Sequence, residues 1–180
     1  MDEEKLIMDW KNRSAYIFIK TKKGKAQEVW QRFQDWDNII GTWIISGEWD
    51  VIAWFDAPDL EIVHNCVATI KNWDEVEHTS SHMVYDGFKS DRWWWEKPAG
   101  TWVLLRENKM DEIPNKIKKW KWTTSGASIP GDWDYITWIE GQNWDEVWNH
   151  LNEIKTENWQ TSAIVPTKSW WNQNWKNNWW

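Results

Sequence analysis

The spacing of apolar residues changes early in the chain. Residues 15–20 form a short, almost wholly apolar run of β-formers, which predicts a strand buried on both faces. After this run the apolar residues recur at spacings of three and four, with charged and polar residues between them. They are Ala26, Val29, Trp30, Phe33 and Trp36. Such spacing places them on one side of a helix, so we expect a helix that packs on the strand.

Two further apolar runs, 39–46 and 49–56, are separated only by Gly47 and Glu48. So short a connection predicts an antiparallel hairpin, and Gly47 can supply the positive φ that a two-residue turn requires.

A second helical pattern follows, with Asp59 as a suitable N-cap. We expect its buried face to be Leu60, Val63, Val67 and Ile70. Alternation from 76 to 85 then predicts a fourth strand.

The pattern starts again in the second half of the chain. Pro130-Gly131-Asp132-Trp133-Asp134 repeats the turn at Ser46-Gly47-Glu48-Trp49-Asp50, with the two turn glycines 84 positions apart. The next helix, capped by Asn143, has its apolar positions 84 after those of the first: Trp144, Val147, Leu151 and Ile154. This agreement indicates an internal repeat.

The other elements of the second half fall in the same order. Strands are predicted at 101–106, 122–129, 133–140 and 159–165, and a helix face at Met110, Ile113, Ile117 and Trp120. Each half thus predicts an α+β unit, βαββαβ, whose four-stranded sheet has two helices on one face. The other face needs a cover, and a second copy would provide it.

Composition limits the classes of function. The 180 residues are 41% hydrophobic and 27% charged, with a net charge of −7, so we expect a globular protein without direct nucleic-acid binding. No apolar run is long enough for a membrane helix, and the acidic N-terminus has no signal core, so a cytoplasmic location is expected. The single Cys66 excludes an internal disulfide.

Tryptophan is unusually abundant, with 23 residues against 3 Tyr and 4 Phe. Lineage bias or an altered sequence would explain this, and so would an aromatic interaction surface. The candidates for that surface lie in a Trp-rich linker and a Trp- and Asn-rich tail: Trp93, Trp94, Trp95, Trp170, Trp171, Trp175, Trp179 and Trp180.

The first half resembles the ligand-binding domain of the Lrp/AsnC regulators, also called the RAM domain. The resemblance lies in Ala15-Tyr16-Ile17-Phe18-Ile19-Lys20, in Gly24-Lys25-Ala26-Gln27-Glu28-Val29, and in Ser46-Gly47-Glu48-Trp49-Asp50-Val51-Ile52-Ala53. Trp49 and Trp133 stand where the family usually has Tyr. The second half resembles the same domain, but its first helix has diverged further.

This resemblance implies two tandem ferredoxin-like domains that form an internal pseudo-dimer of the dimeric α/β-barrel type. The expected parts are an extension (1–14), a first RAM-like domain (15–86), a linker (87–99), a second RAM-like domain (100–168) and a tail (169–180).

In the family the hairpin turn lies at an interface between subunits, where a small effector, often an amino acid, binds. The residues implied here are Gly47, Glu48, Trp49, Asp50, Gly131, Asp132, Trp133 and Asp134. The regulators also carry a helix-turn-helix, for which residues 1–14 are too few. We therefore expect a stand-alone effector-binding protein, not an enzyme, that binds a small molecule or a paralogous subunit and forms homo-oligomers.

Two interpretations of the turn aspartates remain open. Asp50 and Asp134 could accept the ammonium group of a ligand while the turn amides hold its carboxylate. Alternatively, each carboxylate accepts backbone hydrogen bonds and stabilises its own hairpin.

The histidines and the cysteine offer weaker chemistry. His64, His78, His82 and His150 invite a metal or haem interpretation, but His78 and His82 are about 13 Å apart at strand rise, too far to chelate one ion alone. We predict no cofactor and no metal site, with Cys66 as a partly buried hydrophobe. An assembly protein that uses the Trp-rich segments, and a haem protein or enzyme of the dimeric α/β-barrel type, are the alternatives.

Overall fold

The structure, a computed structural model, describes residues 6–7, 14–89, 97–107 and 112–172. The chain divides into two compact units. The first-half unit contains residues 14–84 and 166–172, and the second-half unit contains residues 6–7 and the described part of 85–165. Each unit has its own antiparallel sheet.

The first-half unit follows the predicted order of elements. It consists of β2 (Ser14–Thr21), α1 (Ala26–Arg32) with a 3-10 turn (Phe33–Asp35), β3 (Ile39–Ile45), β4 (Val51–Asp56), α2 (Leu60–Lys71), β5 (Val76–Met83) and β11 (Pro166–Trp171). The strand order is β11-β3-β4-β2-β5. Without β11 this is the ferredoxin-like order, with the first and third strands in the centre.

The second-half unit repeats this arrangement. It consists of β1 (Leu6–Ile7), β6 (Gly87–Lys89), β7 (Ala99–Arg106), α3 (Glu112–Ile117), β8 (Thr123–Ser128), β9 (Tyr135–Gly141), α4 (Trp144–Thr156) and β10 (Gln160–Ile164). The strand order β1-β6-β8-β9-β7-β10 contains the same four-stranded core. The predicted fold class, α+β with tandem ferredoxin-like units, is confirmed.

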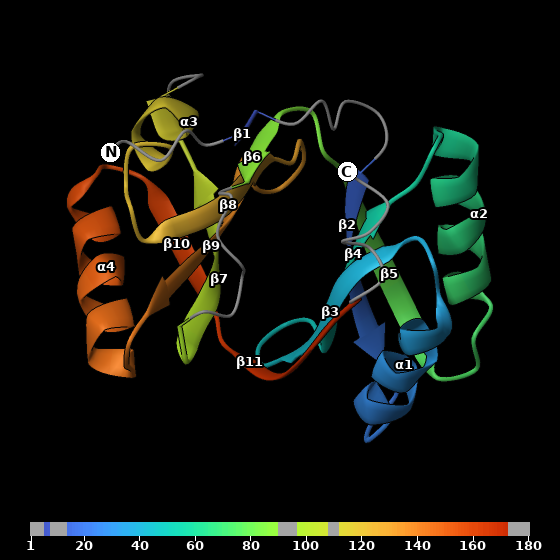
Figure 1. The fold of residues 1–180 in the computed structure, drawn as a ribbon. Coiled ribbons are helices and arrows are strands. Elements are labelled where there is room, and N and C mark those ends of the chain that lie inside the picture. The colour runs from blue at the N-terminus through green and yellow to red at the C-terminus, as the bar shows by residue number, and fades with distance from the viewer. Residues whose placement is uncertain (1–5, 8–13, 90–96, 108–111, 173–180) are drawn as a thin grey trace. The chain divides into compact units, whose positions relative to one another are not determined.

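Helices cover one face of each sheet (Figure 1). In the first-half unit, Ile17 and Ile19 of β2 face Val29 and Phe33 in one buried cluster. The strand residues are two apart and the helical residues four apart. The spacings that predicted the strand and the helix therefore also place these residues on the faces that meet in the core. In the second-half unit the corresponding cluster includes Val103, Leu105, Ile113 and Ile117.

Both predicted helix N-caps are present. The Asp59 carboxylate accepts from the Ile62 amide at 2.9 Å, and the Asn143 side-chain oxygen accepts from the Glu146 amide at 2.9 Å. These bonds satisfy amides that would otherwise lack an intrahelical partner.

The first position of each predicted helix stripe is wrong. Leu60 is 47% exposed and Trp144 is 50% exposed, whereas the later stripe residues Val63 and Val147 are buried. Both exposed residues open their helices. A helical side chain leans toward the N-terminus, so at the first position it points past the end of the helix instead of onto the sheet.

The connecting segments differ most from the expected boundaries. The chain after β10 forms β11, which pairs with β3 of the first-half sheet, where the sequence suggested the end of a domain and a tail. The chain after β5 forms β6, which pairs with β8, and residues 6–7 pair with β6. Each sheet therefore receives an added edge strand from a segment expected to be a linker, tail or extension.

Candidate functional site

The two predicted turns have the same backbone hydrogen bonds. The Ile45 amide donates to the Asp50 carbonyl at 2.9 Å, and the Ile129 amide donates to the Asp134 carbonyl at 3.0 Å. Gly47 has φ +124° and Gly131 has φ +151°, which favour glycine. The loops are longer than the two residues predicted, because β4 and β9 begin after the aspartates.

Each turn aspartate bonds to the backbone of its own sheet. Asp50 Oδ2 accepts from the Thr21 amide at 2.8 Å and from Thr21 Oγ1 at 3.2 Å. Asp134 Oδ2 accepts from the Glu107 amide at 2.9 Å. These bonds hold the end of the first strand of each unit to the start of the third. The carboxylates thus accept backbone hydrogen bonds, as the alternative interpretation expected, but the donors lie outside the hairpin. Their ligand-binding role stays a prediction.

The first turn also contains an ion pair, and among the described residues the second turn has none. Lys20 Nζ lies 3.2 Å from Asp50 Oδ1, with the two side chains 34% and 28% exposed. The equivalent of Lys20 is Arg106, whose guanidinium lies 5.3 Å from the centre of the Trp133 ring and bonds the Gln160 side chain at 3.3 Å. The first turn therefore presents adjacent charges of opposite sign at a partly exposed position.

The turn tryptophans are half-buried, and Glu48 and Asp132 are exposed. The Trp49 ring lies 6.3 Å from the Phe18 ring, centre to centre. Phe18 and Lys20 are two residues apart on β2 and therefore on one face of the sheet. The ion pair and this aromatic pair are thus neighbours at the end of the sheet.

We call the sheet face opposite α1 and α2 the helix-free face of the first-half unit. Strand register places Tyr16 opposite both Trp54 and His82, and Phe18 opposite Ser80. The Tyr16 and Trp54 rings stack with centres 5.1 Å apart. Next to them along β4 is the buried carboxyl of Asp56.

His82, which the sequence suggested only as a weak metal or haem candidate, is a further functional candidate on this face. It is buried, its Nε2 lies 3.0 Å from Ser80 Oγ, and its ring meets the Phe18 ring edge-on at 5.3 Å. His82 and Ser80 are two residues apart on β5, so the strand period places them on one face. The neighbours of His82 on β2 follow only from strand register, which the sequence does not show.

The helix-free face of the second-half unit is less polar. Trp102 and Trp138 replace the Tyr16–Trp54 pair, with ring centres 5.1 Å apart. Leu104 stands in the position of Phe18, and Ile164 pairs with Trp102 as His82 pairs with Tyr16. The histidine and the ion pair therefore distinguish the first-half unit.

The predicted tryptophan surface falls partly on described residues. Trp171 meets Trp43 edge-on at 4.8 Å, and Trp170 packs on the helix-side core, so both hold β11 to its sheet. The other six candidates, Trp93, Trp94, Trp95, Trp175, Trp179 and Trp180, lie outside the described residues.

Of the other histidines, His64 and His78 are exposed, while His150 stacks on Trp122 at 4.4 Å. Burial lowers the pKa of His150 and raises the pKa of the Cys66 thiol. Within the described residues, no group of three or more His, Cys, Asp or Glu side chains could hold a metal ion.

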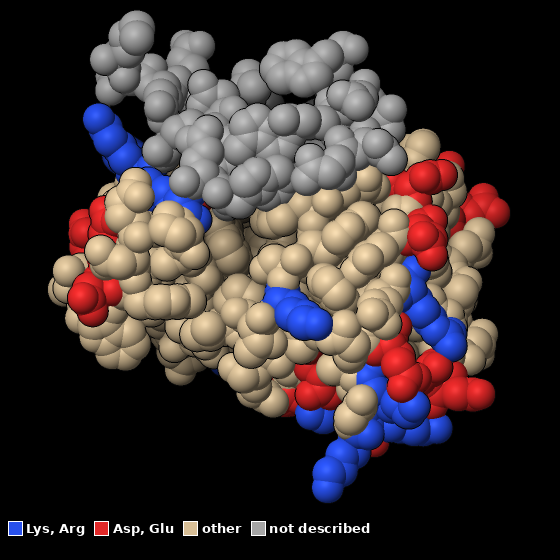
Figure 2. Space-filling model, turned by 60° about the horizontal axis from the view of Figure 1, so that its bottom comes forward, with Lys and Arg blue, Asp and Glu red and all other residues tan. Residues whose placement is uncertain are grey.

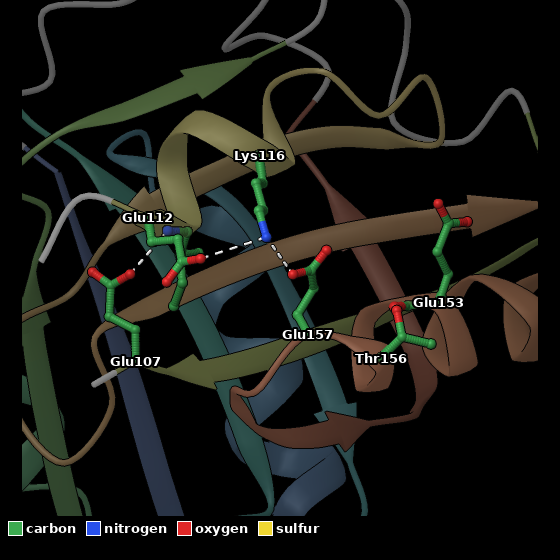
Figure 3. Close-up of polar contacts among 7 residues, drawn as sticks. Glu107, Glu112, Lys116, Glu153, Thr156 and Glu157 are labelled. Carbon is green, nitrogen blue, oxygen red and sulfur yellow. Dashed lines mark hydrogen bonds and ion pairs between the residues drawn. The ribbon is translucent and has the colours of Figure 1, made fainter. Parts of the chain in front are cut away.

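The acidic residues near α3 act as structural links. Lys116 points between Glu112 of its own helix and Glu157 at the end of α4, and Glu107 accepts from the Ile113 amide at 2.9 Å (Figure 3). The Glu157 contact raises the pKa of Lys116.

On the face of the molecule shown in Figure 2, Lys and Arg lie among Asp and Glu and do not form one basic patch. This agrees with the acidic composition.

The comparisons with known proteins give a family-model match over the first half and a similar fold over most of the chain. Residues 14–94 match the model of the Lrp/AsnC ligand binding domain. No curated protein sequence matches the chain. That the second half is another copy of this domain stays a prediction.

Three solved structures, two of them of one protein, show the same fold over most of the chain. The siroheme decarboxylase NirDL is 7% identical, with 93% of this chain and 76% of that chain covered and a TM-score of 0.67. Its co-complex with an iron-uroporphyrin III analogue gives 8% identity, the same coverage and a TM-score of 0.66. A candidate monooxygenase from Fusobacterium nucleatum subsp. nucleatum ATCC 25586 is 11% identical, with 89% and 93% covered and a TM-score of 0.51.

None of the helices among the described residues is long and apolar enough to span a membrane.

Proposed function

We propose that the chain is an effector-binding protein whose first-half unit binds an amino-acid-like molecule beside the Gly47–Asp50 turn. The observation that carries this proposal is the partly exposed Lys20–Asp50 pair next to the Phe18–Trp49 pair. The match of residues 14–94 to the Lrp/AsnC ligand binding domain supports the same class of function.

The two pairs complement the parts of an amino acid. Lys20 contributes only one of its three donors to Asp50 at a time, so its ammonium group can also bind a carboxylate. Asp50 Oδ1 can accept from an ammonium group while Oδ2 stays bonded to Thr21. The half-buried Trp49 ring, packed against the buried Phe18, provides apolar contact for the side chain, and His82 with Ser80 adds polar groups farther along the face.

The test is calorimetric titration with a panel of amino acids. Lys20→Ala should weaken binding by about tenfold or more, because a charge-assisted hydrogen bond is lost. Phe18→Leu, which imports the residue of the second half, should weaken binding of aromatic amino acids more than of small ones. The matched control is Arg106→Ala, at the equivalent position of the second-half unit, which should leave the affinity unchanged.

A wild-type chain that gives no heat with any amino acid contradicts the proposal. So does an equal loss of affinity in the Lys20 and Arg106 variants, because the site would then not belong to the first turn.

A tetrapyrrole is the second candidate ligand, and buried His82 favours it. NirDL, a protein of similar fold, has been crystallised with an iron-uroporphyrin III analogue. A porphyrin that carries many carboxylates requires several cations, whereas Lys20 is the only Lys or Arg on the described strands of the first-half helix-free face. We therefore favour the amino acid.

Absorption titration with iron-uroporphyrin separates the two candidates. Saturable binding that His82→Ala abolishes, and that the exposed-residue control His78→Ala retains, would favour the tetrapyrrole.

A further inference from the structure

Helix α4 carries two tryptophans on its exposed surface. Trp144 is 50% exposed and Trp148 is 59% exposed, although neighbouring Val147 and Leu151 are buried. They are four residues apart, so their rings form one ridge along the side of the helix. The equivalent positions of α2 are Leu60 and His64, so this aromatic ridge belongs to the second-half unit only.

The ridge ends in a cation. Lys155 Nζ lies 5.3 Å from the centre of the Trp148 ring, within cation–π distance. Lys155 is the only Lys or Arg in α4 and lies in its last turn, whereas Asp145 and Glu146 lie in its first turn. Each copy of α4 is therefore acidic at the start and has its single cation at the end.

We infer that this ridge is an interface at which α4 of one chain pairs antiparallel with α4 of a second copy. In that orientation Asp145 of each helix, three residues before Trp148, lies near Lys155 of the other helix, and the tryptophans of both helices pack together. Glu146 and Glu153 lie on other sides of the helix, two residues from a tryptophan and from Lys155 respectively, and the Glu146 carboxylate accepts from the Gln142 amide. A parallel pair would bring like charges together, so the charge order selects the antiparallel one.

Other partners suit the ridge less well. A nucleic acid or an anionic membrane would be repelled by the acidic residues of α4 and by the net charge of −7. A copy of the same helix provides both the apolar surface and the matching charges.

The size of the ridge sets the strength of the association. Trp144 and Trp148 are only about half exposed, so burying what remains of four such side chains removes about 300–600 Å² from water, well below the ~1,200 Å² of a standard interface. We therefore expect a weak dimer whose population rises with protein concentration. The inference does not depend on the proposed effector site, because no residue is shared.

The experiment is sedimentation velocity on the full chain from low to high micromolar concentration. Wild type should shift from monomer toward dimer. Trp144→Ala/Trp148→Ala should raise the dimer dissociation constant by about tenfold or more, since aromatic residues dominate such contacts. The matched control Leu60→Ala/His64→Ala, at the equivalent exposed positions of α2, should behave as wild type, with circular dichroism verifying that all variants fold.

A charge swap tests the antiparallel orientation. Lys155→Asp should weaken the dimer, and Asp145→Lys/Lys155→Asp should restore it, because the reversed pair is again complementary. The inference is overturned by a wild type that stays monomeric, by a tryptophan variant that dimerises as wild type does, by an α2 control that weakens equally, or by a charge swap that fails to restore association.

Discussion

The two units build the same fold with different residues at matching places. Ser14 of β2 corresponds to Gly100 of β7, and each lies beside the tryptophan of the third strand. In the first-half unit the Trp54 indole donates to Ser14 Oγ at 2.8 Å. In the second-half unit a Cβ on Gly100 would lie 2.4 Å from Trp138. One tryptophan is held by a hydroxyl, and the other lies directly against backbone.

A second pair of positions shows the same kind of exchange inside the core. Val51 and Thr42 of the first-half unit correspond to Tyr135 and Gly126 of the second. A Cβ on Gly126 would lie 2.7 Å from the Tyr135 ring, so the larger residue of one strand depends on the smaller residue of its neighbour. The fold is therefore maintained by complementary pairs of residues and not by single residues.

The link between the helices is also repeated. Arg32 bonds Glu75 at 2.7 Å and lies 5.1 Å from the Trp73 ring centre. Lys116 bonds Glu157 and lies 5.6 Å from the Trp159 ring centre. In both units a cation of the first helix region joins a carboxylate and a tryptophan after the second helix.

The largest expected effect is at Gly100. Gly100→Ala should destabilise the protein by about 3 kcal/mol, because the new methyl group overlaps the buried Trp138 indole. Ser14→Ala removes a hydrogen-bonding hydroxyl without a clash and should cost about 1 kcal/mol. Urea unfolding of the two variants measures the difference, and an equal cost at both positions would contradict the packing comparison.

A change at Tyr135 should offset the loss of stability caused by a change at Gly126. Gly126→Thr should cost about 2 kcal/mol by overpacking against Tyr135 and Phe88. Adding Tyr135→Val imports the first-half pair and should recover a large part of that loss. A double-mutant cycle by thermal unfolding measures the coupling, which should be about 1 kcal/mol or more for residues in contact. Additive effects would show that the two positions are independent.

The two turn aspartates should differ in how much they stabilise the protein, and Asp50, which makes more bonds, should contribute more. Asp50→Ala removes two bonds to Thr21 and the Lys20 pair, and should cost about 2 kcal/mol, whereas Asp134→Ala removes one described bond and should cost about 1 kcal/mol. Chemical denaturation compares them. An Asp134 variant that is the less stable of the two would reverse this assignment.

The smallest expected effect is a pH dependence of stability that comes from Cys66 and His150, which occupy the same position in the two units. His150 and Cys66 correspond in the repeat, and burial favours the neutral form of both. The pKa of His150 lies below its usual 6.5, so the native state binds fewer protons than the unfolded chain as pH falls through 6.5, and stability decreases. His150→Phe should remove this acid-side slope.

The thiol acts on the alkaline side. The pKa of Cys66 lies above its usual 9.0. The contribution of the thiol to the stability of the folded state is therefore complete below pH 9.0 and is lost as pH rises through the native pKa. Cys66→Ala should flatten that limb and leave the acid limb unchanged. Thermal midpoints across pH measure both slopes, and a variant whose slope matches wild type would exclude that group as the cause.

Much of the fold was predictable because it rests on local periodicity. The strand at 15–20, the caps Asp59 and Asn143 and the turn glycines all depend on neighbouring residues. The candidate site was predictable only in part. Asp50 was identified from the turn, but Lys20, Phe18 and His82 come from two other strands. Only strand pairing brings Lys20 to Asp50, and Phe18 to both Trp49 and His82.

The order of elements and the class of fold follow from the sequence alone, as does the repeat of 84 positions, because spacings of two, three and four are set by backbone geometry. The tertiary structure decided the strand register, the edge strands β6 and β11, and the exposure of Leu60 and Trp144. These depend on contacts between residues far apart in the chain, which no local pattern encodes. The Lys20–Asp50 pair and the exposed Trp144–Trp148 ridge are therefore features that only the folded structure shows.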